Sequence, residues 1–176
     1  MGTSGCSTSA ADAASCLWPP QSGCRGAEAV GIDLWSARDQ SGNRSEATLQ
    51  NARLEGVEER VKVVTGDMRE MPFPDASFDA AVASLSIHNI PSRDGRAQAI
   101  REIARVLKPG GRVAIMDIAG TRHYQETLRE LGWNDLRRTG FRLQMFPPLR
   151  IVTGSKPPGS GQEPTLKSTT SPSLTR

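Results

Sequence analysis

The sequence is poor in cysteine, in aromatic residues and in long apolar runs, and each shortage excludes a class of protein. Its three cysteines, Cys6, Cys16 and Cys24, all lie in one short N-terminal segment. Their number and spacing fit neither a disulfide framework nor a paired zinc-binding element, so we predict no metal site. No apolar run approaches the roughly 20 residues of a transmembrane helix, and no basic-then-apolar leader opens the chain. We therefore expect no transmembrane segment and a cytoplasmic location.

Aromatic residues make up 5% of the chain, and its charge is nearly balanced, with 22 basic and 19 acidic side chains. The two signs are interspersed between Arg38 and Arg142. A nucleic-acid-binding protein instead gathers basic and aromatic side chains on one surface, so we predict no nucleic-acid partner. At 176 residues the chain has room for one domain. Nothing in the sequence specifies an oligomeric state.

Short apolar segments alternate with amphipathic helical patterns along most of the chain. Two of these segments, 28–33 and 112–118, are apolar enough to be buried on both faces of a sheet. Residues 141–145 and 149–154 are predicted to form an antiparallel hairpin at the end of the domain. The alternation predicts a doubly wound, mostly parallel α/β sheet with helices on both faces. The predicted strands are 28–33, 60–65, 78–87 and 112–118, and the predicted helices are 45–55, 94–107 and 124–131.

Two carboxylates, Asp33 and Asp67, follow predicted strands, at the edge where open α/β sheets bind ligands. Asp33 is placed to accept hydrogen bonds from both hydroxyls of a ribose, or to cap a nearby turn. Asp67 is either part of the same nucleoside site or a plain turn residue after Gly66. Trp35 offers a flat surface to a purine, or belongs to the core or to a lid.

Two further motifs follow in order. Ser77-Phe78-Asp79 opens the apolar run Ala80 to Leu85, and Leu107-Lys108-Pro109-Gly110-Gly111 precedes the run Val113 to Ile118. Together with the two aspartates, these motifs resemble the class I S-adenosylmethionine (SAM) dependent methyltransferases. The most similar branch is methyltransferase type 11, which includes the ubiquinone and menaquinone biosynthesis C-methyltransferases. The resemblance covers roughly Glu28 to Pro157 and implies a Rossmann-like fold, SAM as cofactor and a small-molecule methyl acceptor. It does not identify that acceptor, nor whether carbon, nitrogen or oxygen receives the methyl group.

The resemblance also assigns roles at the cofactor site. Asp33 would bind the ribose, Asp67 would accept from the adenine amino group, and the backbone N–H of Met68 would meet a ring nitrogen. Leu34 or Trp35 would lie with Met68 on the adenine faces. The predicted cofactor-binding residues are Asp33, Leu34, Trp35, Gly66, Asp67, Met68, Ser84 and Leu85.

Ser84 to Asn89 lies where the family's fourth strand leaves the sheet and faces the sulfonium and the acceptor. We predict His88 and Asn89 as catalytic residues, which orient the acceptor or, for His88, remove its proton, because an imidazole titrates near neutral pH. A structural, hydrogen-bonded His88 fits the sequence equally well. His123 is predicted to be a capping or surface residue, and Asp79 and Asp117 to be structural.

The family's first strand ends in a glycine-rich turn that lies about 20 residues before the ribose-binding acid. That spacing falls on Ala11 to Ser15, where no Gly-x-Gly and no preceding apolar strand occur. We therefore expect the first strand to be absent, residues 1–27 to be irregular, 28–156 to form the methyltransferase-like domain and 157–176 to be a disordered tail.

The missing turn suggests a truncated or alternatively started methyltransferase whose activity is impaired. A second hypothesis is a non-catalytic remnant that serves as a binding or interaction module. A nicotinamide-dependent oxidoreductase is a third hypothesis, which we disfavour because it also requires Gly-x-Gly-x-x-Gly and leaves Asp67 without a role.

Overall fold

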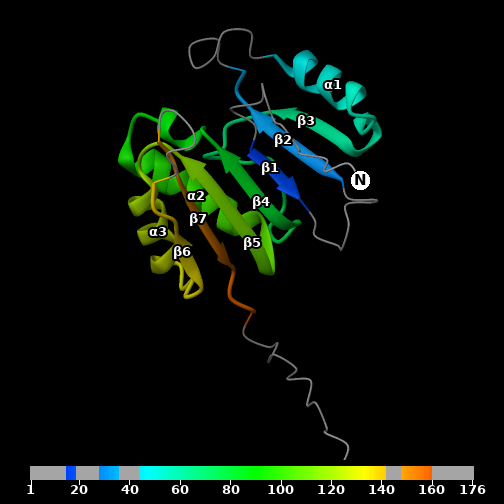
Figure 1. Ribbon diagram of the computed structural model, residues 1–176. Coiled ribbons are helices and arrows are strands. Elements are labelled where there is room, and N and C mark those ends of the chain that lie inside the picture. The colour runs from blue at the N-terminus through cyan, green and yellow to red at the C-terminus, as the bar shows by residue number, and fades with distance from the viewer. Residues whose placement is uncertain (1–14, 19–27, 36–43, 142–147, 160–176) are drawn as a thin grey trace, which may run out of the picture.

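The computed structural model describes residues 15–18, 28–35, 44–141 and 148–159. Its centre is a seven-stranded sheet with the strand order β3-β2-β1-β4-β5-β7-β6 (Figure 1). The pairs β2–β3 and β4–β5 are parallel, whereas β7 is antiparallel to both β5 and β6. The strands are β1 (Ser15–Trp18), β2 (Ala29–Asp33), β3 (Val61–Thr65), β4 (Phe78–Ser84), β5 (Leu107–Asp117), β6 (Leu136–Arg138) and β7 (Arg150–Ser155). The α-helices are α1 (Ser45–Leu54), α2 (Arg93–Val106) and α3 (Thr121–Glu130), and short 3-10 helices are η1 (Glu58–Arg60) and η2 (Ile87–Asn89).

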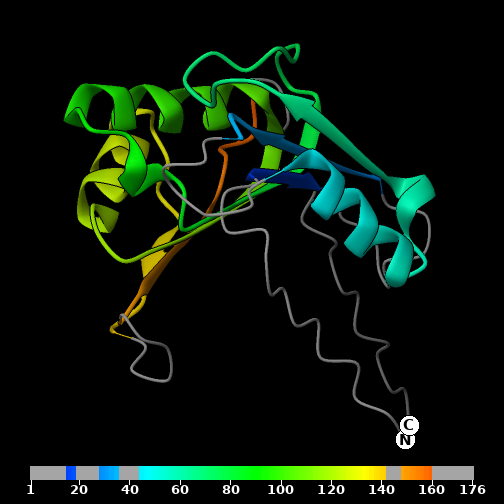
Figure 2. The ribbon, with the colours of Figure 1, turned by 90° about the horizontal axis from the view of Figure 1, so that it is seen from above.

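The helices cover both faces of the sheet. The chain passes from β2 through α1 to β3 in one direction along the sheet, and from β4 through α2 to β5 in the other. Because crossovers between parallel strands are right-handed, two units that progress in opposite directions place their helices on opposite faces. Figure 2 shows α1 and α2 on opposite sides of the sheet, and α3 contacts α2. The predicted doubly wound α/β fold is confirmed.

A strand occupies the central position of the sheet, where we predicted that the first strand is absent. Residues Ser15–Trp18 form β1, which pairs with β2 on one side and with β4 on the other, so that prediction is wrong for these four residues. Both pairings are antiparallel, with Ser15 opposite Ile32 and Trp18 opposite Ala80. The backbone groups of β2 and β4 thereby gain hydrogen-bond partners that a missing strand would deny them. The remaining residues of the predicted irregular segment, 1–14 and 19–27, lie outside the described residues.

The structure confirms a closing antiparallel hairpin, formed by β6 and β7. Its first strand is Leu136–Arg138, which pairs with Arg150–Ser155. Of the predicted first strand, 141–145, only Phe141 is described, and it is not part of β6, whereas 142–145 lie outside the described residues. Between α3 and β6 the chain turns at Gly132, which is in a left-handed conformation (φ 84°). Trp133, directly after it, is buried in the core, and β6 begins at Leu136.

The core lies mainly between the sheet and the pair α2 and α3. In β5 the side chains of Val113, Ile115 and Asp117 are buried, whereas those at alternate positions are more exposed. The prediction that 112–118 is buried on both faces is therefore wrong for one face. The largest fully buried side chains are Trp133, Tyr124, Ile32, Ile87, Ile100, Ile103, Leu107, Ile115, Leu128, Val106 and Val152.

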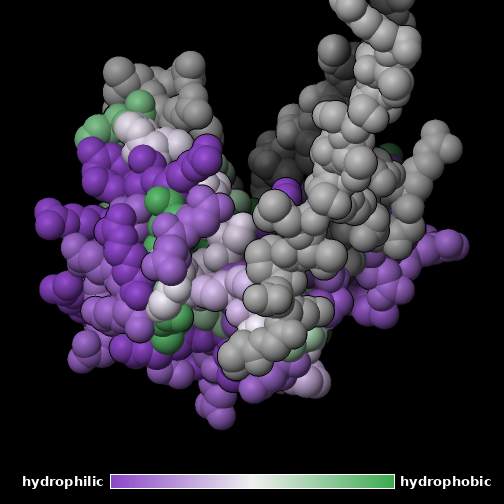
Figure 3. Space-filling view, turned by 90° about the horizontal axis from the view of Figure 1, so that it is seen from below, coloured by the Kyte–Doolittle hydropathy of each residue, from purple (hydrophilic) through white to green (hydrophobic). Residues whose placement is uncertain are grey.

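The opposite face is covered more thinly in the described part of the chain. Val82, in β4 beside β1, is 38% exposed, and α1 buries only Ala52. The surface seen in Figure 3 is mostly hydrophilic, with small separate hydrophobic patches. No helix among the described residues is long and apolar enough to cross a bilayer.

An ion-pair network fixes the loop that connects β3 to β4. Glu102, on α2, accepts a hydrogen bond from the backbone N–H of Met71 (2.8 Å) and pairs with Arg105 (Nε to Oε1, 2.8 Å). Arg105 also donates to the backbone carbonyls of Met71 and Phe73 at 3.0 and 2.8 Å. The loop therefore depends on a charge that α2 supplies.

We expect Glu102→Gln to lower the free energy of unfolding by about 1.5–3 kcal/mol, because it removes the charge from the hydrogen bonds that Glu102 accepts from Met71 and Arg105. The Arg105 guanidinium holds the pKa of Glu102 below its ordinary value of 4.5. The stabilisation is thus complete above about pH 4.5 and is lost as the pH falls through the folded-state pKa. Urea unfolding at pH 7 and pH 3 tests this. A difference between wild type and variant that is equal at the two pH values would contradict it.

Candidate functional site

A cavity of about 150 Å³ lies at the carboxyl edge of the parallel strands β2 and β3. Asp33 is opposite Thr65 in the register, so Gly66 and Asp67 leave β3 beside the end of β2. The start of the segment after β4 closes the other side of the cavity. The lining residues are Ile32, Asp33, Leu34, Gly66, Asp67, Met68, Arg69, Ser86, Asn89, Ile90 and Pro91.

Asp33 is the buried carboxylate of this cavity, with 7% of its surface exposed. Its Oδ1 accepts a hydrogen bond from the backbone N–H of Trp35 at 2.6 Å, and its carbonyl accepts from the N–H of Gly66. Trp35 has a positive φ of 54°, and its indole donates to Thr65 Oγ1 at 2.9 Å. The turn after β2 thus directs Trp35 toward β3, and Leu34 lines the cavity instead.

Asp67 is held by Arg69. The Arg69 backbone N–H donates to Asp67 Oδ1 at 2.8 Å, and its Nε contacts both carboxylate oxygens at 3.0 and 2.9 Å. The guanidinium lowers the pKa of Asp67, so this carboxylate is ionised at neutral pH. Any nucleobase that contacts the Asp67 side chain would therefore also contact the Arg69 side chain, which lines the same cavity.

The cavity at Asp33 is smaller than most ligand pockets. Typical small-molecule pockets measure about 300–1,000 Å³, which exceeds the cavity of about 150 Å³. In a parallel first strand, a turn would follow that strand at this edge. Here β1 runs antiparallel, so its first residue, Ser15, lies beside Ile32, and its last residue, Trp18, lies toward the opposite edge, opposite Ala80. Among the described residues, no glycine-rich turn reaches the cavity.

His88 and Asp117 form a dyad next to this cavity. His88 Nδ1 lies 2.6 Å from Asp117 Oδ1, and the His88 backbone N–H donates to Asp117 Oδ2 at 3.1 Å. The carboxylate is 1% exposed and the imidazole 23% exposed. Ser86, the N-cap of η2, and Asn89, its last residue, both line the cavity. The dyad therefore combines a fixed buried carboxylate with a partly accessible imidazole.

Two further groups fix the Asp117 carboxylate. The Ile118 backbone N–H donates to Oδ1 at 2.7 Å, and the Tyr124 hydroxyl donates to Oδ2 at 3.1 Å. Burial, and then the Asp117 charge, raise the pKa of Tyr124 far above its ordinary value, so its hydroxyl remains a donor. Sequence reasoning left Asp117 as structural. The parallel register, with Ser84 opposite Met116, places the end of β5 beside the segment that carries His88.

The structure brings five of the eight predicted cofactor-binding residues into the cavity, and Asn89 with them. Trp35, Ser84 and Leu85 do not line it. Leu85 instead continues the sheet, since its N–H donates to the Met116 carbonyl at 2.9 Å. The cofactor-binding and catalytic roles of all these residues stay predictions. The five that line the cavity are Asp33, Leu34, Gly66, Asp67 and Met68.

His123 lies in the first turn of α3, away from the dyad. Its Nδ1 accepts from Arg93 Nε at 3.3 Å, and its Nε2 lies 3.2 Å from the Arg93 carbonyl. A neutral imidazole with its proton on Nε2 satisfies both contacts. Within the described residues, no group of three or more His, Cys, Asp or Glu side chains is placed to hold a metal ion.

The chain is similar to methyltransferases in sequence and in structure. A sterol 4-C-methyltransferase of Caenorhabditis elegans is 34% identical over 105 residues, which are 60% of this chain and 29% of that protein. A demethylmenaquinone methyltransferase of Staphylococcus aureus is 34% identical over 90 residues, 51% of this chain and 32% of that protein. The chain thus spans about a third or less of the length of the curated relatives it matches.

The crystal structure of the [4+2]-cyclase SpnF superposes with a TM-score of 0.59 at 22% identity, covering 74% of this chain and 66% of that chain. That likeness shows the fold. The family model described as "Methyltransferase domain" matches residues 13–115, more than half of the sequence. The chain therefore belongs to the methyltransferase domain family.

Proposed function

We propose that this chain is the catalytic core of a SAM-dependent methyltransferase that acts on a small molecule. The observation that carries the proposal is the His88–Asp117 dyad beside a cavity that holds a buried carboxylate, Asp33, in a member of this family. Family membership favours methyl transfer over nicotinamide chemistry, and Asp67 at the cavity gives a second polar contact for an adenine.

The residues present fit the adenosine half of SAM. A buried carboxylate offers acceptors to two ribose hydroxyls, and such charge-assisted hydrogen bonds are short and strong. Leu34, Met68 and Ile90 provide apolar contacts for a flat base in the same cavity. When bound, SAM supplies a methyl group on a sulfonium, which needs no metal or covalent intermediate.

In the proposed reaction, His88 acts as the base. Because Nδ1 lies 2.6 Å from Asp117 Oδ1, we assign the proton of the neutral ring to Nδ1, which leaves Nε2 as the proton acceptor. The buried carboxylate stabilises the imidazolium that forms when His88 takes a proton, and it fixes the ring orientation. An acceptor that loses a proton during methylation, such as a hydroxyl, fits this arrangement. Asn89 lines the cavity, and in this proposal its side-chain amide orients that acceptor.

Holding the two reactants in line is the other contribution of the protein, and alignment of this kind lowers barriers by about 7–11 kcal/mol. The two relatives named above act, by their names, on a sterol and on demethylmenaquinone, both small molecules. We extend only that class, a small-molecule acceptor, to this chain. A binding module without catalysis remains the second candidate, because the described residues place no glycine-rich turn at the cavity.

Isothermal titration of the full chain with S-adenosylhomocysteine and with 5′-methylthioadenosine tests the proposal. Both compounds carry the adenosine half, and only the first carries the amino-acid part. We expect saturable binding of both, with affinities within about tenfold of each other, because the contacts in the described residues lie on the adenosine side.

Absence of binding by both compounds to a chain that is folded by circular dichroism would overturn the proposal. Binding of S-adenosylhomocysteine alone would show that residues outside the described part hold the amino-acid half, and would contradict the adenosine-centred site. Binding of NADH with higher affinity than either compound would favour the nicotinamide-dependent oxidoreductase hypothesis instead.

A further inference from the structure

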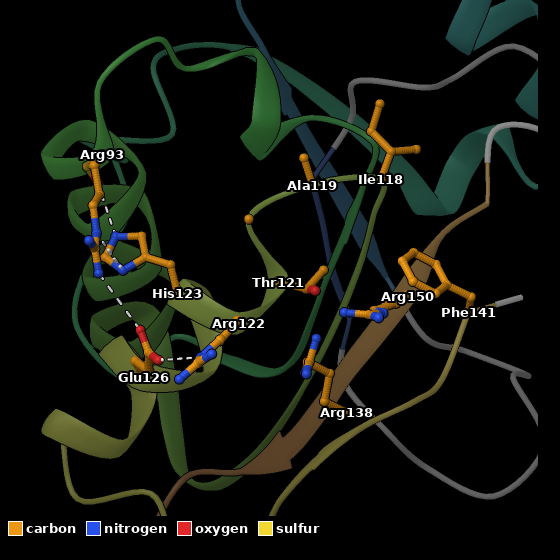
Figure 4. A pocket seen from close by; sticks show the side chains of 11 residues that line it. Arg93, Ile118, Ala119, Thr121, Arg122, His123, Glu126, Arg138, Phe141 and Arg150 are labelled. Atoms are coloured by element: carbon orange, nitrogen blue, oxygen red, sulfur yellow. Dashed lines mark hydrogen bonds and ion pairs between the residues drawn. The ribbon is translucent and has the colours of Figure 1, made fainter.

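A second and larger cavity, of about 520 Å³, lies beyond the dyad at the end of β5. We call it the arginine cavity. It begins at Ile118, directly after Asp117, and is bordered by the first turn of α3 and by the facing ends of β6 and β7 (Figure 4). Its position next to the dyad places it where the part of a methyl acceptor that does not react would lie.

The arginine cavity carries an excess of positive charge. Four guanidinium groups and one carboxylate, Glu126, line it. Glu126 is shared by Arg122 (Nε to Oε1, 2.9 Å) and Arg93 (Nη2 to Oε2, 3.7 Å). Within the described residues, neither Arg138 nor Arg150 has a carboxylate partner. Figure 4 shows both of these side chains directed toward the same space beside Thr121.

Arg150 is held by a ring instead of by an anion. Its Cζ lies 3.7 Å from the centroid of the Phe141 ring, and its buried Nε has no hydrogen-bond partner in the described structure. A buried donor without an acceptor is costly, whereas a stacked guanidinium keeps its N–H edge available for a bidentate contact. The geometry therefore offers a pre-oriented donor to an oxyanion.

Helix α3 points its N-terminus at the same cavity. Its N-cap is Gly120 (φ 75°), which provides no side chain to the first-turn N–H groups. Free N–H groups and the positive end of the helix dipole both favour an anion at this position. Thr121 adds a hydroxyl to the lining.

We infer that the arginine cavity binds the carboxylate or phosphate of the methyl acceptor, an inference that rests on the proposed methyl transfer. The rest of the acceptor is partly apolar, because Ile118 and Phe141, the latter 56% exposed, lie in the same lining. Its reacting group lies toward His88, and its anion toward Arg138 and Arg150. A neutral sterol or quinone would leave these two guanidinium groups without a counter-charge.

Titration of the full chain at low ionic strength with benzoate, phenyl phosphate and the neutral benzamide tests the inference. We expect benzoate or phenyl phosphate to bind at least about tenfold more tightly than benzamide, and to weaken with added salt. The tighter of the two anions identifies carboxylate or phosphate as the recognised group. Equal binding of all three compounds, or no binding of either anion, would overturn the inference.

Variants locate the site. Arg138→Gln combined with Arg150→Gln should weaken anion binding by about tenfold or more, because each lost charge-assisted hydrogen bond is strong. Arg137→Gln is the matched control: it removes the same charge from the adjacent, exposed position of β6 and should change nothing. Arg150→Lys, which keeps the charge, should fold and retain part of the affinity. Anion affinity that is unchanged in the double variant would overturn the inference.

Titration of the same proteins with S-adenosylhomocysteine separates this inference from the proposed function. We expect its affinity to be unchanged in every arginine variant, because none of these residues lines the Asp33 cavity. Failure of S-adenosylhomocysteine to bind the wild type would count against the proposed function alone. Loss of its binding only in the double variant would contradict the separation of the two cavities.

Discussion

Asp117→Ala is expected to lower the free energy of unfolding by about 3–5 kcal/mol, the range found when one partner of a buried pair is removed. The carboxylate is 1% exposed, accepts hydrogen bonds from the Tyr124 hydroxyl and from the backbone N–H groups of His88 and Ile118, and lies 2.6 Å from His88 Nδ1. The substitution leaves these groups without their acceptor in a site that excludes water. Urea unfolding followed by the fluorescence of the buried Trp133 measures the effect.

Asp79→Ala is the matched control, because Asp79 also lies in a sheet strand and also pairs with a cation, Lys108 (2.9 Å). Its side chain is about one-third exposed, so solvent screens the pair and we expect a loss of only about 0–1 kcal/mol. Tyr124→Phe should fall between the two, at about 1 kcal/mol, since it removes one of the donors and keeps the ring. Equal losses for Asp117→Ala and Asp79→Ala would show that the dyad has no special role in stability.

Much of the fold could be predicted from local patterns because the relevant physics is local. The amphipathic pattern that includes Ala97, Ile100 and Ile103 predicted α2 almost to its ends, since one apolar face at helical spacing suits a helix on a sheet. The strand that ends at Asp33 was likewise found from its apolar run, and the strand that ends at Thr65 from its β-branched residues. The crossover rule then fixed which faces the helices cover.

The errors arose where pairing over long sequence distances decides the structure. Ser15–Trp18 has too little strand pattern to predict, and it forms β1 because β2 and β4 present backbone groups on both sides of it. Similarly, Leu136–Arg138 is a strand because β7 lies beside it, and its own sequence pattern did not predict it. Whether such a short segment forms a strand depends on the strands that pair with it, which local sequence patterns do not reveal.

The sequence predicted those parts of the candidate site that lie at the ends of strands. Asp33 and Asp67 meet at one cavity because parallel strands end at the same edge, which the sequence order already implies. The same rule, applied to the end of β5, would have paired Asp117 with His88. The arginine cavity was not predictable, because Arg93, Arg138 and Arg150 come from three elements that only the tertiary fold brings together.

Asp33→Asn is expected to weaken binding of S-adenosylhomocysteine by about 10- to 100-fold. Asparagine keeps the shape and an oxygen that can accept the backbone N–H of Trp35, so the turn after β2 should persist. It removes the charge from the contacts proposed for the two ribose hydroxyls, and each charge-assisted hydrogen bond contributes about 1.5–3 kcal/mol. Isothermal titration of both proteins under the same conditions gives the ratio.

Glu28→Gln supplies the comparison that makes this result specific, because Glu28 lies just before the other end of β2, exposed and paired with Lys62 at 3.1 Å. It removes the same charge from the chain at the opposite edge of the sheet, so a long-range electrostatic effect on the ligand would appear in both variants. We expect affinity to fall only in Asp33→Asn. Equal weakening in both variants would assign the effect to net charge. Unchanged affinity in Asp33→Asn would contradict the proposed contact between Asp33 and the ribose. A fall confined to Asp33→Asn would instead place the nucleoside at the buried end of β2, within reach of the neighbouring dyad.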